Sequence, residues 1–366
     1  MKHFVFYLFF LLSLNLCAQN SILSDKESIT KIEFGLDSIY NFQFNQVDEI
    51  YEHLDEKYPD HPLPPLFNAI IIYWQHFPVT PNSPYHRIYM ENITQAISDA
   101  DLLLDEDPKN PELLFMSLMA RLLVMQYYAD NDESSKVIPY VRKAYKLAKK
   151  GFALDHKIQD FQFITGLYNY YREAYPEKHP VYKPMAYFFP EGNKELGIKQ
   201  LENNWHHGIF LDAESLSFLV YISLNYEGNY KKSARYTKEL HKLYPNNPLF
   251  LSYRIRSLLL QKKYNKALPF IQELETNQAS NDFFKTMSLI YRGIYEEKKN
   301  KNFIAAEVFY QKAIDLSDSY KPFINSRISY AYFGLARICK NKDRKKATSY
   351  RKKAMDLSSS AHLNFD

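Results

Sequence analysis

The stretch that decides the fold covers residues 230–248 and reads YKKSARYTKELHKLYPNNP. Its apolar and small side chains recur at spacings of three, four and three residues: Tyr230, Ser233, Thr237 and Leu240. Such spacing places them on one face of an α-helix. Pro245 cannot continue that helix, and a second proline three residues later suits the start of another. The stretch therefore predicts a helix, a rigid link and a further helix.

The same pattern recurs elsewhere in the chain. Two further copies with prolines are Phe44, Val47, Tyr51, Leu54, Pro59 and Ile93, Ala96, Ala100, Leu103, Pro108. The three links read PDHP, PKNP and PNNP. Two copies keep the helix face without the prolines: Tyr264, Ala267, Ile271, Leu274 and Phe303, Ala306, Tyr310, Ala313. Phased recurrence of this kind predicts an array of stacked helix pairs.

The repeat length carries a family resemblance. From Tyr230 to Tyr264 is 34 residues, small residues stand where helices touch, and proline marks the links. This resembles the tetratricopeptide repeat (TPR), whose first helix often holds a glycine between bulky residues, as at Gly35, Gly293 and Gly334. The resemblance implies an all-α, right-handed α-solenoid of about eight TPR-like helix pairs. The clearest repeats are 28–61, 86–111, 214–247, 248–281 and 287–320.

Composition supports a helical scaffold. The 366 residues include only 9 Gly and 2 Cys, with 46% hydrophobic and 16% aromatic residues. So few glycines disfavour folds built on glycine-rich phosphate loops or many tight β-turns. Two cysteines exclude a disulfide scaffold, and the hydrophobic content excludes bulk disorder.

The N-terminus predicts an exported protein. Lys2 precedes an apolar run over residues 4–12, and Ala18 offers a small residue for cleavage. We expect residues 1–18 to be a signal peptide that directs the chain to the periplasm or cell envelope. Lipid attachment at Cys17 is a weaker alternative, because Leu16 stands where a small residue is wanted. Residues 19–366 are expected to form a single TPR-like domain.

One segment breaks the helical rhythm. Residues 175–192 read YPEKHPVYKPMAYFFPEG and carry four prolines and no helical period. Before it, Tyr168, Tyr171 and Tyr175 share one helical face. The tyrosines could stack on a sugar or a proline-rich peptide, and the segment could cap a groove; both could equally be packing within the scaffold.

No motif for chemistry is visible. The chain has no HExxH, CxxC, GxSxG or phosphate-loop pattern, and adjacent His206 and His207 cannot ligate one metal from a helix face. His53 and His61 are interpreted as parts of a solvated acidic face. We therefore expect no metal, no cofactor and no catalytic residue, although an enzyme assembled from scattered residues stays open.

Charge is divided unevenly along the chain. Residues 21–120 hold 5 basic and 17 acidic residues, whereas residues 121–366 hold 40 and 25. In a solenoid these portions are expected to remain apart. The end of the chain concentrates basic side chains: Arg344, Lys345, Lys346, Arg351, Lys352 and Lys353. This basic C-terminal patch could face an anionic surface or be a solvated capping helix; export disfavours nucleic acid.

The resemblance also implies a function. TPR-like solenoids use a concave surface, lined by the first helix of each pair, to hold a peptide or protein segment. We expect a non-enzymatic interaction scaffold or adaptor with an unknown protein or peptide partner. The groove candidates on first helices are Tyr168, Tyr171, Arg172, Ser252, Arg256 and Arg292. The alternative is a glycan or small-ligand binding protein that uses the tyrosine stripe and residues 175–192.

Overall fold

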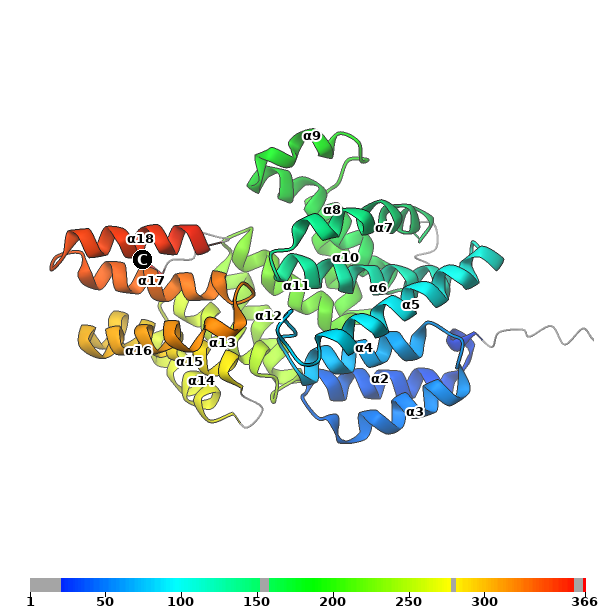
Figure 1. Cartoon of the computed structure of the whole chain (residues 1–366), viewed down its shortest axis with the longest axis horizontal. Coiled ribbons are helices and arrows are strands. Elements are labelled where there is room, and N and C mark those ends of the chain that lie inside the picture. Colours follow the sequence, from blue (N-terminus) through cyan, green and yellow to red (C-terminus); the bar gives the residue numbers. More distant parts are fainter. Residues whose placement is uncertain (1–20, 152–157, 278–280, 359–364) are drawn as a thin grey trace, which may run out of the picture.

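The computed structural model describes residues 21–151, 158–277, 281–358 and 365–366, and within these ranges it is all-helical with no strand (Figure 1). Consecutive helices pack against each other, consistent with a helical solenoid. The expected signal peptide and Cys17 lie outside the described residues. Among the helices in these ranges, none combines the length and the apolar character needed to cross a bilayer.

The helices are taken in three groups along the chain. The first part of the chain forms η1 (Ile22–Ser24), α2 (Lys26–Tyr40), η2 (Phe44–Gln46), α3 (Val47–Lys57), α4 (Leu63–Gln75), α5 (His86–Glu106) and α6 (Pro111–Asp130). The middle forms η3 (Ser134–Val137), α7 (Ile138–Gly151), α8 (Phe161–Lys178), η5 (Pro180–Tyr182), α9 (Lys183–Ala186), α10 (Lys194–His207), α11 (Asp212–Asn225) and α12 (Tyr230–Leu243). The last part forms α13 (Pro248–Leu260), α14 (Tyr264–Thr276), α15 (Asp282–Tyr295), the π-turn η6 (Glu296–Asn300), α16 (Phe303–Leu316), η7 (Asp318–Tyr320), α17 (Asn325–Cys339) and α18 (Arg344–Leu357).

The asparagine-proline links start helices by a shared device. Asn110 accepts hydrogen bonds at Oδ1 from the backbone N–H groups of Glu112 and Leu113, at 3.0 and 3.2 Å. Asn247 does the same for α13, at 2.9 and 3.1 Å. The proline that follows each asparagine has no N–H to satisfy, so it is well placed at the first helical position. These links set where α6 and α13 begin.

Small residues let the helices approach closely. Ala96, Ala267 and Ala306 are completely buried. The ring of Tyr310 lies between Gly293 of α15 and Gly334 of α17: a Cβ atom at these glycines would lie 2.6 Å and 2.2 Å from ring carbons. The glycines therefore make room for an aromatic side chain from the second helix of a pair, since any side chain there would collide with it.

The array bends until its N-terminal helices meet its later ones. Figure 1 shows α2 and α4 near α12 and α13, and hydrogen bonds join the end of α2 to the link between α12 and α13. The Tyr244 hydroxyl donates to Asp37 at 3.1 Å, and Asn247 donates to the carbonyl of Tyr40 at 2.7 Å. The ring of Phe77 stacks on Phe284 with centroids 5.8 Å apart. The expectation that distant portions of the chain remain apart is therefore wrong for these segments, because the curvature of the stack returns them to one another.

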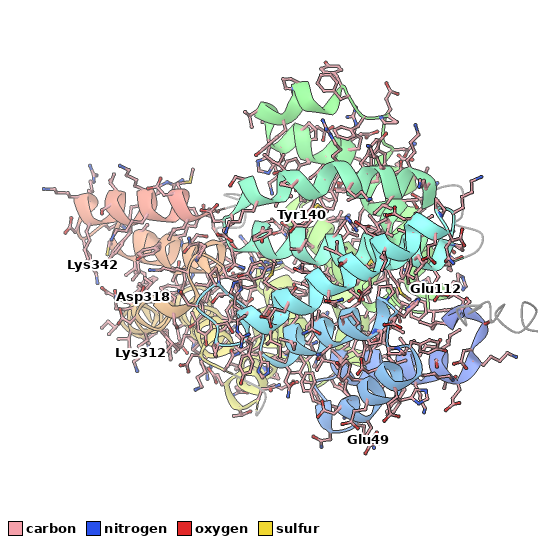
Figure 2. All side chains as sticks on the ribbon, turned by 45° about the vertical axis from the view of Figure 1, so that its right-hand side comes forward. Glu49, Glu112, Tyr140, Lys312, Asp318 and Lys342 are labelled. Atoms are coloured by element: carbon pink, nitrogen blue, oxygen red, sulfur yellow. The ribbon has the colours of Figure 1, made fainter. Side chains whose placement is uncertain are left out.

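The interpretation of His61 as a solvated residue is also wrong. His61 is buried, and its Nε2 lies 3.1 Å from Oε1 of Glu112. Its Nδ1 accepts from the backbone N–H of Leu63, so Nε2 carries the proton and donates. Glu112, labelled in Figure 2, also accepts from Ser21 and the backbone N–H of Ile22, so it fastens η1 to α6.

The segment 175–192 is partly helical. Helix α8 continues to Lys178 with Pro176 inside it, and η5 and α9 follow. The prediction of no helix is therefore wrong for these residues. Pro176 is tolerated because it lies in the last turn, where the disrupted hydrogen bonding affects only the end of the helix. Figure 1 shows α9 projecting beyond the body of the molecule.

Candidate functional site

A cluster of polar and aromatic side chains is contributed by α4, α6, α11, α13 and α17, and the charges of its members shift one another's pKa values. We call it the inner cluster, and its members are Tyr73 on α4, Asp130 on α6, Tyr221 on α11, Tyr253 and Arg256 on α13, and Arg327 on α17. Burial raises the pKa of Tyr221, Arg327 lowers it and Asp130 raises it again. Charges from α6 and α17 therefore lie close to a phenol on α11, although these helices are far apart in sequence.

Asp130 combines exposure to solvent with a pKa that neighbouring protein raises. Its side chain is exposed to solvent. Burial nevertheless raises its pKa to about 6, against the opposite effects of a hydrogen bond from Gln126 and the charge of Arg327. Both observations hold together where a side chain faces an open space that protein surrounds on most sides, since neighbouring protein displaces much of the bulk water. We interpret the surface around Asp130 as concave on this ground.

Three tyrosines of the inner cluster are crowded by neighbouring protein in the same way. Burial raises the pKa of Tyr73 well above its usual range, and the charge of Asp130 adds to the shift. Tyr221 is 38% exposed although burial raises its pKa, which is the same combination that Asp130 shows. Burial also raises the pKa of Tyr253, while Arg327 and Arg256 lower it. These tyrosines thus offer aromatic faces beside polar groups, and such a surface is suited to stacking and hydrogen bonding.

The two arginines of the inner cluster differ in exposure. Arg256 is 1% exposed; its Nη1 lies 3.5 Å from the hydroxyl of Tyr330, and its Nε and Nη2 have no hydrogen-bond partner. Arg327 is half-buried and donates to the hydroxyl of Ser326 at 3.1 Å. Burial acts to lower the pKa of Arg327, but nearby phenols, Tyr330 first, raise it overall. The guanidinium of Arg327 therefore remains charged.

Three of the residues expected in the groove lie in or beside the inner cluster. Arg256 belongs to it. Burial raises the pKa of Tyr171 far above its usual range and Tyr221 adds to the shift, so Tyr171 adjoins the cluster from α8. Ser252 is 1% exposed and donates to the carbonyl of Leu249 at 2.8 Å, one turn back on its own helix. Ser252 is therefore packed below the surface.

The other three expected groove residues bind neighbouring parts of the scaffold. The Tyr168 hydroxyl donates to the carbonyl of Pro190 at 2.7 Å, and Arg172 donates to that of Phe189 at 3.0 Å through Nη2. These two side chains hold the end of the 175–192 segment against α8. Arg292 forms a two-pronged ion pair with Glu275 on α14, at 3.1 and 3.2 Å. Its guanidinium is thus already neutralised.

Sequence reasoning missed Asp130, Tyr221, Tyr253 and Arg327, yet the repeat held a signal for part of this set. Tyr253 and Tyr330 are the sixth residues of α13 and α17. Tyr221 and Tyr291 are the tenth residues of α11 and α15. Positions four apart share a helix face, so aligned first helices show a recurring tyrosine surface. Nothing comparable marks Asp130 or Arg327.

Other surfaces stand apart from the inner cluster. The six side chains of the basic C-terminal patch are all exposed on α18, beyond the turn that Lys342 marks in Figure 2. Val181, Tyr187 and Phe188 project from the 175–192 segment with 78%, 88% and 85% of their surface exposed. A hollow of about 550 Å³ lies between α10 and α12, where Glu202 and Arg235 pair at 3.2 Å.

The comparisons with known proteins assign no family and no function to the chain. No family model matches the chain, and no curated protein matches it. Within the part of the chain that the structure describes, no group of three His, Cys, Asp or Glu side chains could hold a metal ion. The inner cluster is therefore the candidate functional site.

Proposed function

We propose that this chain is an exported, right-handed TPR-like solenoid of about eight helix pairs. In this proposal it is a non-enzymatic scaffold or adaptor of the cell envelope, and it holds a peptide or protein segment on its inner face. Neither a metal nor a cofactor takes part. The helix pairs supply a rigid framework, and the inner cluster supplies the contacts.

One observation carries the proposal: polar and aromatic side chains from five helices gather in the inner cluster, and two of them stay open to solvent, which we interpret as a concave surface. Asp130 and Tyr221 are exposed, yet burial raises the pKa of both. Concave surfaces that combine apolar walls with a few polar groups are typical of binding sites. Tyrosine contributes a large contact area with little conformational entropy to lose, so it suits recognition of a segment.

Selection of peptides tests this proposal. Random peptides displayed on phage are selected against the immobilised full chain, and the affinity of a selected peptide is then measured by fluorescence anisotropy. Tyr253→Ala and Tyr221→Ala are each expected to weaken binding about tenfold or more, because buried aromatic contacts dominate most interfaces. Arg235→Ala, on the exposed side of α12, is the control and keeps the affinity. Failure to select any peptide, or equal binding by all variants, contradicts the proposal.

The second candidate function is that of a glycan or small-ligand binding protein, and three tyrosines of the inner cluster favour it. Tyr73, Tyr221 and Tyr253 offer faces on which sugar rings could stack, and Asp130 offers a hydrogen-bond acceptor. A glycan array separates the two candidates. Glycan binding that Tyr253→Ala abolishes, without selectable peptides, favours the second.

A further inference from the structure

Arg256 is the least satisfied charged group of the inner cluster. Its guanidinium is 1% exposed, and of its three nitrogens only Nη1 has a partner, the hydroxyl of Tyr330 at 3.5 Å. The ring of Tyr253 lies 5.7 Å from the guanidinium carbon and gives only a modest stabilisation of the charge. A buried charge without an ionic partner is strongly unfavourable. The fold keeps it nevertheless.

Two other arginines, one buried and one half-buried, have ionic partners. Arg121 is 4% exposed and pairs with Asp101 at 2.6 Å. Arg337 pairs with Glu297 through two nitrogens, at 2.6 and 2.8 Å. Among the described residues, neither Arg256 nor Arg327 forms an ion pair with a carboxylate. The inner cluster therefore holds two guanidiniums, with Asp130 as the acidic side chain that acts on Arg327.

We propose that Arg327 and Arg256 form an oxyanion-binding site within the inner cluster. The ligand would carry a phosphate, sulfate or carboxylate group, which share two or more charged oxygens that accept from guanidinium N–H groups. This inference rests on the proposed function, because it names the chemical group by which the inner face holds its ligand.

The geometry assigns the two arginines different roles. Arg327 is half-buried, so it contacts the oxyanion directly from the open side. Arg256 is buried, and its Nη1 donates to the oxygen of Tyr330, which lies three residues after Arg327 on α17. A phenol that accepts a hydrogen bond from a cation is a better donor of its own proton. Tyr330 can therefore donate a stronger hydrogen bond to the bound anion than an isolated phenol would. Both arginines and the phenol act as positioning and binding groups.

Thermal unfolding of the full chain in simple anions tests the site. Melting temperatures are measured in sodium phosphate, sulfate and acetate against chloride at the same ionic strength. The natural chain is expected to gain stability in a saturable way, because a ligand that binds only the folded state stabilises it. Arg327→Gln is expected to remove the gain. Arg235→Ala removes an arginine that is already paired with Glu202, and should retain it.

Arg256→Met separates a binding role from a structural one. Replacing an unpaired buried charge with an apolar side chain of similar length should raise the melting temperature without anion, and the anion should then add little. If Arg256 were a structural element, the same variant would melt lower. A natural chain with no saturable response, or an Arg327→Gln variant that responds equally, overturns the inference.

Further arms identify the anion and keep the inference separate from the proposed function. A stronger response to phosphate and sulfate than to acetate indicates a tetrahedral group, and the reverse indicates a carboxylate. A selected peptide is also compared with its C-terminal amide. If anions bind but no peptide is selected, the oxyanion site stands and the peptide-binding proposal fails. If peptides bind Arg327→Gln as tightly as the natural chain, the proposed function stands and the oxyanion site fails.

Discussion

The side-chain amide of Asn247 donates a 2.7 Å hydrogen bond to the backbone carbonyl of Tyr40, across 207 residues of chain. The same side chain caps α13 through its Oδ1 atom. One residue therefore starts a helix in the second half of the array and fastens it to the first half. Because this contact holds the array in a curved form, it also helps bring the inner helices around one shared surface.

Asn247→Ala should destabilise the chain by about 2 kcal/mol, since it removes a helix cap and a buried hydrogen bond. Asn110→Ala is the matched control: Asn110 caps α6 in the same sequence setting but makes no bond to Tyr40, so its loss should be about 1 kcal/mol. Urea denaturation measures both. Equal losses would mean that the contact between Asn247 and Tyr40 contributes nothing to stability.

Gly334→Ala should destabilise the chain by about 1–3 kcal/mol through overpacking, although alanine is the better helix former. The reason is the ring of Tyr310, with a carbon 2.2 Å from the position that the new Cβ would take. Denaturation of the single and double variants checks this. In a Tyr310→Leu background the cost of Gly334→Ala should largely disappear. An additive pair would show that the ring and the glycine do not interact.

The chain should lose stability as pH rises from about 4.5 to 8, in part because of Glu214. Burial raises the pKa of Glu214 from 4.5 to about 8, and the Tyr40 hydroxyl donates to it. Over this range the unfolded chain releases a proton that the folded chain retains, so rising pH favours unfolding by at most about 1.4 kcal/mol per pH unit. Below the unfolded pKa both states are protonated and no penalty remains.

Glu214→Gln should remove that part of the slope, because the amide does not titrate and can still accept from Tyr40. Denaturation at several pH values should show the variant gaining on the natural chain between about pH 5 and 8. Glu195→Gln, at an exposed position on α10, is the control. Parallel stability profiles for the natural chain and Glu214→Gln would contradict a raised pKa at this residue.

Replacing residues 180–188 with a Gly-Ser link of equal length should leave most of the far-UV helical signal intact. Val181, Tyr187 and Phe188 are largely exposed, so their removal sacrifices little burial. Leu201→Ala serves as the contrast: Leu201 is completely buried on α10 against Gly166 of α8, and its loss should cost about 2–5 kcal/mol. A link variant that loses most of its helical signal would show that the segment is part of the core.

Helices and their ends were accessible from sequence because their causes are local. Tyr230, Ser233, Thr237 and Leu240 lie within three turns of one helix, and Asn247 needs only the next three residues to cap α13. Glycines between bulky residues of a first helix were also visible, as at Gly293 and Gly334, but the Tyr310 ring that lies against both was not. Periodicity and capping act over about four residues, so one sequence displays them directly.

The candidate site depended on tertiary structure. Arg256 was named from its place on a first helix, but its lack of an ionic partner and its contact with Tyr330 of α17 follow from the tertiary arrangement. The charge of Asp130 acts on Tyr221 because a small rotation between neighbouring helix pairs adds up along the array and brings α6 near α11. The same accumulated rotation brings Tyr40 to Asn247. The sequence by itself determined the helix pairs and their links, whereas only the tertiary structure decided the curvature and the inner surface, because no local motif encodes an angle accumulated over many repeats.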